Sequence, residues 1–125
     1  MAEDLIMVST RKRGAYYENK AKEHLELMGY EVERALPKTI WIKGKTISLH
    51  HDFFGLWDLI AVSPSTILFV QVKYEGVKTN ENWQEKRKLM EKFAVPTNCR
   101  KEVWHYEVKE GIRNPQLRRE VIQDA

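Results

Sequence analysis

Two short apolar runs constrain the fold of this chain more than any other feature of its sequence. Residues 57–62 and 67–72 are mostly apolar, and the segment Ser63-Pro64-Ser65-Thr66 between them is typical of a turn. Short apolar runs without strict alternation are typical of strands buried on both faces. The sequence therefore predicts two adjacent strands at the centre of a sheet, joined by a reversal of the chain.

Five further elements follow from hydrophobic periodicity and from turn residues. They are a helix over 12–28, a strand over 30–36, a hairpin over 39–49, a second helix over 80–94 and a final strand over 103–108. The first helix rests on Tyr17, Ala21, Leu25 and Met28, which share one helical face, and Gly29 is placed to end it. This order predicts an α/β (α+β) sandwich around a small mixed sheet.

Length and composition fit a single domain over residues 1–125. The chain has 42% apolar and 31% charged residues, enough for one ordinary hydrophobic core, which we expect to span about residues 11–108. The segment 111–125 is expected to be a loose tail, and its arginines suit a helix, a partner-binding arm or a disordered end. The sequence shows no repeat and no low-complexity linker.

Several classes of protein are disfavoured by the sequence. No apolar run approaches the roughly 20 residues that cross a bilayer, and the start of the chain lacks the basic and apolar regions of a signal peptide. We therefore expect a cytoplasmic protein without a membrane partner. The single cysteine, Cys99, excludes an internal disulfide and a zinc site built from cysteines.

Basic residues are clustered, although the net charge is only +3. Residues 38–45 contain three lysines and no acid, and further basic clusters occupy 11–13 and 86–88. Each cluster alone fits a solvated face as well as a binding surface. The candidates for contacts with nucleic acid are Arg11, Lys12, Arg13, Lys43 and Lys45.

Three polar residues stand where the pattern predicts burial. Asp58 begins an apolar run, and a buried carboxylate costs several kcal/mol unless a cation or donor groups hold it. Gln71 and Lys73 end the next run and lie on one face of that strand because side chains alternate. The alternatives are an Asp that caps a turn, and a solvated Gln and Lys at a strand end.

The reversal between the two runs places Asp58 and Gln71 at the same end of neighbouring strands. A carboxylate, an amide oxygen and the Lys73 ammonium at one sheet edge suit hydrolysis of a phosphodiester assisted by Mg²⁺, which prefers oxygen ligands. Glu18 borders the buried stripe of the first helix and is placed to reach this edge, although a surface salt bridge is the alternative.

Three segments in this order resemble the PD-(D/E)XK nuclease superfamily, and most closely the archaeal Holliday junction resolvases and related small nucleases. The segments are Gly14-Ala-Tyr-Tyr-Glu18, Phe54-Gly-Leu-Trp-Asp58-Leu-Ile-Ala61 and Phe69-Val-Gln71-Val-Lys73, the last followed by an amphipathic helix. The resemblance covers roughly residues 11–108. It implies a restriction-endonuclease-like αβββαβ core.

The resemblance also implies roles for individual residues. Asp58 would bind the metal, Gln71 stands at the second acidic position, Lys73 would be the catalytic lysine, and Glu18 would act through a water as the acid of the first helix. Val72 would offer its backbone carbonyl to the metal. The implied cofactor is Mg²⁺ or Mn²⁺ with no organic cofactor, and the implied partners are DNA, including branched DNA, and a second copy of the chain in a homodimer.

The sequence departs from the family pattern at two positions. Gln71 replaces an acid and so removes one negative charge from the metal site, and Trp57 replaces the proline of the motif's name. Asp52, next to His50 and His51, is an additional acid close enough in sequence to join the site.

These observations lead to three hypotheses. The first is a Mg²⁺-dependent endodeoxyribonuclease. The second is a nucleic-acid-binding module with the same fold that has lost its metal because of Gln71. The third is a subunit that serves in protein assembly through exposed tryptophans and arginine-rich ends.

Overall fold

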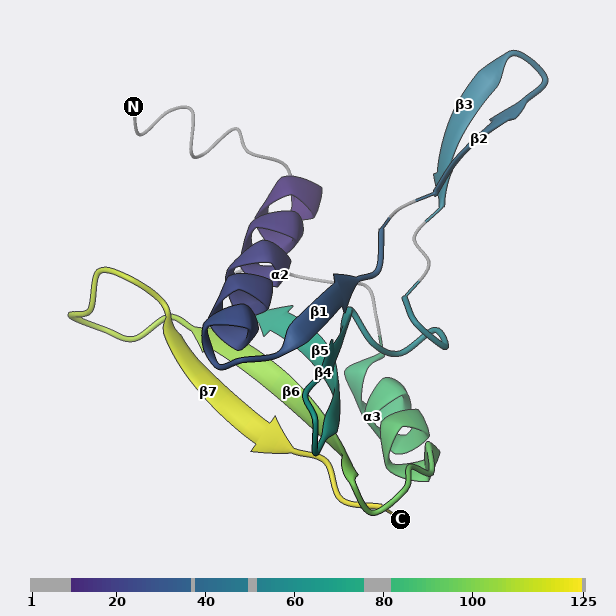
Figure 1. Cartoon of the computed structure of the whole chain (residues 1–125). Coiled ribbons are helices and arrows are strands. Elements are labelled where there is room, and N and C mark those ends of the chain that lie inside the picture. The colour runs from purple at the N-terminus through teal and green to yellow at the C-terminus, as the bar shows by residue number, and fades with distance from the viewer. Residues whose placement is uncertain (1–9, 37, 50–51, 76–81, 125) are drawn as a thin grey trace.

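Five strands form one mixed sheet in this computed structural model, which describes residues 10–36, 38–49, 52–75 and 82–124. In spatial order the strands are β1 (Glu31–Arg34), β4 (Leu59–Val62), β5 (Ile67–Tyr74), β6 (Cys99–Glu107) and β7 (Gln116–Val121). The central strand β5 pairs antiparallel with β4 and parallel with β6, and both outer pairs are antiparallel (Figure 1). The predicted mixed sheet and α+β class are confirmed.

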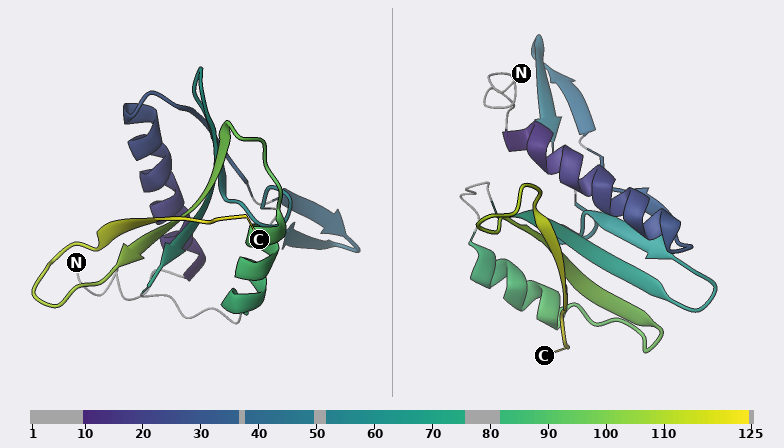
Figure 2. Two further views of the ribbon diagram at one scale, coloured as in Figure 1. Left: turned by 90° about the horizontal axis from the view of Figure 1, so that it is seen from below. Right: turned by 90° about the vertical axis from the view of Figure 1, so that its left-hand side faces the viewer.

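The two helices cover opposite faces of this sheet (Figure 2). Helix α2 (Thr10–Leu27) packs against β1, β4 and β5. Helix α3 (Trp83–Lys92) lies on the other face and makes the crossover between the parallel strands β5 and β6, because parallel neighbours need a long connection. Neither helix is long and apolar enough to cross a membrane.

Each face of the sheet has its own hydrophobic core. Under α2, the predicted stripe of Tyr17, Ala21 and Leu25 is buried against Leu59 and Val70 and their neighbours. The core under α3 contains residues from the loop before β4, from α3, from β6 and from the C-terminal segment. Its buried members are Leu56, Trp57, Met90, Val103 and Ile122. The site described below lies at the N-terminal end of β4.

A separate hairpin projects from the sheet between β1 and β4 (Figure 1). Its strands are β2 (Lys38–Ile42) and β3 (Lys45–Leu49), joined by the two-residue turn Lys43-Gly44. Both turn residues have positive φ, 49° and 76°, which is the conformation that two-residue hairpin turns require and that glycine adopts without strain. The predicted hairpin is confirmed.

The main difference from the expected fold is strand β7, which occupies part of the segment expected to be a loose tail. Its sequence alternates poorly because three consecutive charged residues, 118–120, fill half of its six positions, so hydrophobic periodicity gives no signal. Charge pairs across the β6–β7 ladder hold it instead. Arg119 contacts Glu102 at 2.8 Å and Arg118 contacts Glu107 at 3.0 Å.

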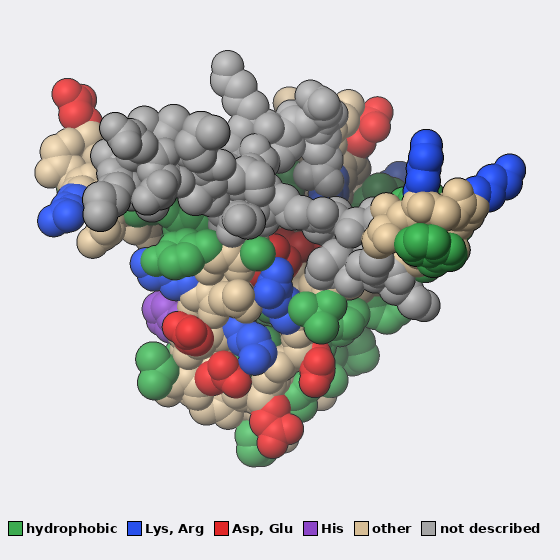
Figure 3. Space-filling view, turned by 90° about the horizontal axis from the view of Figure 1, so that it is seen from above, with side chains coloured by type: hydrophobic (Ala, Val, Ile, Leu, Met, Phe, Trp, Pro, Cys, Tyr) green, Lys and Arg blue, Asp and Glu red, His purple; other side chains and the backbone are tan. Residues whose placement is uncertain are grey.

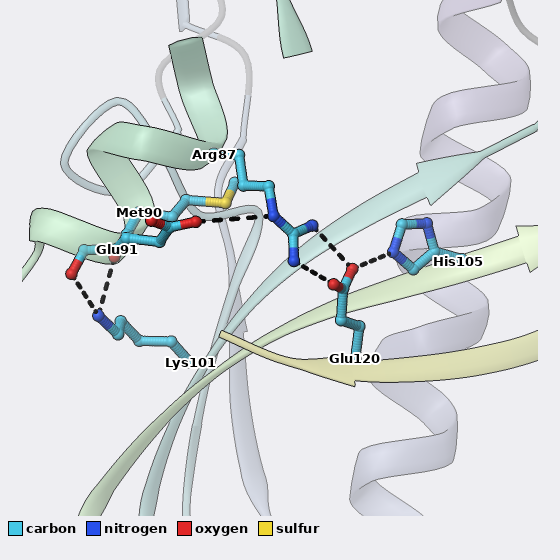
Figure 4. Close-up of polar contacts among 6 residues, drawn as sticks. All are labelled: Arg87, Met90, Glu91, Lys101, His105 and Glu120. Atoms are coloured by element: carbon cyan, nitrogen blue, oxygen red, sulfur yellow. Dashed lines mark hydrogen bonds and ion pairs between the residues drawn. The ribbon is translucent and has the colours of Figure 1, made fainter. Parts of the chain in front are cut away.

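Two polar networks attach α3 to the sheet (Figure 4). Glu120 of β7 accepts hydrogen bonds from Arg87 of α3 and lies 2.9 Å from the His105 ring nitrogen Nε2. The buried ammonium of Lys101 donates to the backbone carbonyls of Met90 at 2.9 Å and Phe93 at 2.8 Å. Lys101 therefore satisfies carbonyl groups that the end of a helix leaves without partners.

Candidate functional site

Two carboxyl groups from different elements meet at the end of β4. Glu18 lies in the middle of α2, and Asp58 immediately precedes β4. The two side chains are close enough for each to shift the pKa of the other, and Asp58 is only 7% exposed. A buried pair of acids of this kind holds a proton between its two members at low pH and attracts cations when both are ionised.

A tight loop over residues 52–57 orients Asp58. The backbone N–H of Phe53 donates to the Trp57 carbonyl at 2.8 Å, and Gly55, with a φ of 71°, donates to Asp52 at 2.9 Å. Trp57 is fully buried in the core under α3. The aromatic anchor and the glycine turn together fix where the chain enters β4.

Asp58 is then fixed to the central strand by two hydrogen bonds. Its backbone N–H donates to the carbonyl of Val70 at 2.9 Å, and its Oδ2 accepts from the backbone N–H of Val72 at 2.8 Å. Because Leu59 pairs with Val70, Asp58 comes next to Gln71 at the same end of the two strands. The expected position of these two residues at the same end of neighbouring strands is present in the structure.

Burial and neighbouring acids raise the pKa of both carboxyl groups. The pKa of Asp58 lies well above its ordinary value, mainly through desolvation, with further increases from the charges of Glu18 and Asp52; the Val72 N–H and Lys86 oppose this rise. The pKa of Glu18 is also raised by desolvation, against the attraction of Arg34. Keeping the cluster ionised therefore requires positive charge close by.

Two cations flank the acids. Arg34 of β1 lies 3.7 Å from Glu18, and its Nη1 also donates to Asn19 at 3.0 Å. Lys86 of α3 lies 3.5 Å from Asp52, and only 10% of its side chain is exposed. Asp52, expected as an additional acid, is thus close enough to influence the pKa of Asp58.

Sequence reasoning missed Lys86 as a member of the site. In the sequence, Lys86 belongs with Arg87 and Lys88 to a basic cluster, and such a cluster fits a solvated face as well as a binding surface. The available signal was its spacing, three residues after Trp83 and four before the buried Met90, which places it on the inward stripe of α3. Its long side chain reaches past the core to the acids.

Gln71 lies on β5 at the same end of the sheet as Asp58. The side chain is 8% exposed, and its Nε2 donates to the Val72 carbonyl at 3.3 Å. Its Oε1 is buried without a hydrogen-bond partner among the described residues. A buried carbonyl oxygen in this state is uncommon in native proteins, and it is also the kind of atom that a hard cation binds.

Lys73 projects toward α3. Its ammonium lies 3.8 Å from the centre of the Trp83 ring, a cation–π contact that fixes the side chain on the α3 face of the sheet. Phe69, on the same strand at an even spacing, packs in the core of that face. The lysine whose charge lowers the pKa of Asp58 is Lys86 of α3.

The remaining candidates are distributed as follows. Lys43 and Lys45 are exposed in the hairpin. The side chains of Arg11, Lys12 and Arg13, in the first turn of α2, lie outside the described part of the structure, as do the expected site residue His51 and its neighbour His50.

Within the described ranges, no group of three or more His, Cys, Asp and Glu side chains is arranged to hold a metal ion. A cation at Asp58 would therefore rely on fewer carboxylates together with neutral oxygens such as Gln71 Oε1 and the Val72 carbonyl. Comparison of the chain with models of protein families, with curated proteins and with solved structures gives no match.

Proposed function

We propose that this protein is a metal-dependent endonuclease that hydrolyses phosphodiester bonds in DNA. The observation that carries the proposal is the buried acid pair of Glu18 and Asp58 next to the amide of Gln71, whose Oε1 has no partner among the described residues. The order of elements supports it, because α2, the antiparallel strands β1, β4 and β5, then α3 and β6 follow the αβββαβ order of restriction-endonuclease-like folds.

The residues at the site fit Mg²⁺ or Mn²⁺. Asp58, Gln71 Oε1 and the Val72 carbonyl would hold the ion directly, and Glu18 would hold it through a water. All are oxygen donors, which these hard cations prefer, and Mg²⁺ commonly keeps several waters beside one or two carboxylates. When bound, the cation would supply Lewis acidity at the scissile phosphate and lower the pKa of a water.

The charged side chains of the site have complementary tasks in this proposal. The ionised acid pair repels a phosphate, so placement of the scissile phosphate at the acids depends on the divalent cation. Lys86 favours the ionised form of Asp58 and Arg34 that of Glu18, and Lys73 orients the attacking water or stabilises the developing negative charge.

One observation favours a second candidate, a nucleic-acid-binding module without catalysis. Gln71 carries no charge, and its Nε2 already donates to the Val72 carbonyl, which is one of the expected metal ligands. This candidate binds DNA in a salt-dependent manner and is indifferent to divalent cations.

The proposal includes a homodimer that acts on branched DNA, as the family resemblance implies, and a cytoplasmic location, as expected from the sequence. Sedimentation of the purified protein at several concentrations tests the homodimer, and a set of junction, flap and linear substrates tests the preference for branched DNA.

A cleavage assay tests the function itself. The protein is incubated with branched, duplex and single-stranded DNA in Mg²⁺, in Mn²⁺ and in chelator, together with the variants Asp58→Asn and Lys73→Met. We expect cutting only with a cation, and a loss of at least about 100-fold in each variant, as for other groups that stabilise transition-state charge. Glu31→Gln and Lys92→Met change exposed residues and serve as matched controls.

The absence of cutting on every substrate contradicts the proposal, and so does cutting that persists in Asp58→Asn. Binding of DNA without cutting, unaffected by chelator, supports the second candidate.

A further inference from the structure

The β2–β3 hairpin presents apolar side chains to solvent on both of its faces, Trp41 on one and Ile42 and Ile47 on the other. Trp41 is 73% exposed, and Ile42 and Ile47 are also exposed. The hairpin stands away from the main sheet and forms its own two-stranded sheet (Figure 1). Isolated two-stranded hairpins are marginally stable at best, so a surface of this kind fits a binding arm that gains order from a partner.

The charge of the hairpin indicates the kind of partner. Residues 38–49 contain three lysines and no acid. Lys43 and Lys45 flank the glycine of the turn and are exposed, and seen from above the basic side chains of the hairpin project into solvent at the right of the molecule (Figure 3). Lysines and an exposed tryptophan on one hairpin suit nucleic acid, because lysines bind phosphates and the indole ring stacks on bases. A protein partner fits less well, because charged residues are depleted from the centre of protein interfaces.

Both ends of the hairpin are followed or preceded in the chain by residues of the acid site. Arg34, which contacts Glu18, comes shortly before the hairpin, and Asp52, which contacts Lys86, comes shortly after it. Strands of five residues at ~3.3 Å per residue reach about 17 Å from the base of the hairpin.

We propose that the hairpin binds an unpaired segment of the DNA substrate, with Trp41 stacked on an unpaired base and Lys43 and Lys45 on phosphates. An indole ring stacks on bases that are splayed out of a helix, and bases within a duplex are not available for this contact. The inference rests on the proposed nuclease function and adds a substrate class to it, DNA with unpaired bases close to the cut.

Binding without cleavage tests the inference. Affinities for single-stranded, gapped and duplex oligonucleotides are measured in chelator, so that no substrate is cut. Trp41→Ala is expected to weaken binding to the single-stranded and gapped DNA by about 10- to 100-fold, as for other stacking aromatics, and to leave duplex binding unchanged. Trp41→Phe keeps an aromatic ring and is expected to recover most of the loss.

The lysines have a different expected signature. Replacing Lys43 and Lys45 with alanine is expected to weaken binding to all three DNAs and to reduce the salt slope by about 2, because each phosphate contact adds about one to it. Lys92→Ala together with Lys109→Ala removes the same charge from other exposed positions and is expected to change neither quantity.

Several outcomes overturn the inference. They are equal affinity of Trp41→Ala and the wild type for single-stranded DNA, an equal loss on duplex DNA, and no binding of nucleic acid by the wild-type protein. A dimer that Trp41→Ala dissociates without any change in DNA affinity assigns the surface to a second copy of the chain instead. Failure of the nuclease proposal is distinguishable, because cutting is then absent even where binding shows the signature of Trp41.

Discussion

The carboxyl groups of Glu18 and Asp58 come from α2 and from the residue before β4, and they lie close enough for each to shift the pKa of the other. Both are raised in pKa by burial, and Asp52 adds a third negative charge to their surroundings. Because burial disfavours the ionised forms of these acids, they lower the free energy of unfolding at neutral pH. Sites of this kind are more frequent where function requires them than in structural cores.

Replacing Asp58 with asparagine is expected to stabilise the protein at neutral pH. The asparagine oxygen can still accept from the Val72 N–H and its amide can donate to Glu18, while the buried charge is removed. We expect a gain of about 1 kcal/mol in the free energy of unfolding at pH 8, measured by urea denaturation.

The sign of the pH dependence follows from the raised pKa of Asp58. The folded state binds the proton more tightly than the unfolded chain, whose pKa is near the ordinary 3.8, so wild-type stability falls as the pH rises from that value through the folded pKa. The advantage of Asp58→Asn is therefore expected to grow over the same interval. An advantage that is constant with pH contradicts the raised pKa.

The sequence predicts this part of the structure well because short-range patterns determine it. The turn at 63–66 requires β4 and β5 to be neighbours, and alternation along β5 separates Gln71 from Val72. The positions of Lys86 and Asp52 depend instead on how α3 packs and how the loop before β4 turns. Spacing places Lys86 on the inward stripe of α3, and Asp52 is close to Asp58 in sequence, but their contact with each other joins distant segments and no local pattern encodes it.

Strand β7 was missed for a related reason. Its pairing with β6 is stabilised by charge pairs, such as Arg119 with Glu102, and these appear in the sequence only as scattered charged residues. The hairpin, in contrast, was predictable because β-forming residues flank a lysine-glycine turn.

Removing the charge of Lys86 is expected to raise the pKa of Asp58 further. Lys86 lowers that pKa at present, and methionine keeps much of the buried side chain without the ammonium. An NMR titration of the aspartate carboxyl carbons in Lys86→Met measures the change, and Lys88→Met, on the exposed face of α3, is the control. An unchanged or lower pKa of Asp58 would show that Lys86 does not act on the acid pair.

Glu120 is expected to stabilise the protein at neutral pH and to lose this contribution in acid. Its hydrogen bonds with Arg87, and then with His105, lower its pKa to about 2. The contribution is fully present above the ordinary value of 4.5 and disappears as the pH falls through about 2. Because the carboxylate is partly exposed, we expect Glu120→Gln to cost only about 1 kcal/mol at pH 6. Urea unfolding of the variant and the wild type should converge toward pH 2; a difference that persists there argues against the charge pairs.

Restoring an acid at position 71 is expected to strengthen cation binding. Gln71→Glu adds a carboxylate next to Asp58 at nearly constant volume, so affinity for Mn²⁺ should rise by about 10-fold or more, since charge count sets affinity at oxygen sites. Without the cation, the same variant should be less stable than the wild type, because it adds another acid to a buried cluster. Calorimetric titration and urea unfolding measure the two effects. Weaker binding by the variant would place the cation elsewhere.

The most direct test of the nuclease account is a titration of the wild-type protein and Asp58→Asn with Mn²⁺, following paramagnetic broadening of backbone NMR signals. The account predicts saturable broadening centred on Val72 and on the start of β4 in the wild type, and its loss in Asp58→Asn. Broadening that is absent from these residues, or that is the same in both proteins, would contradict a cation site at the acid pair.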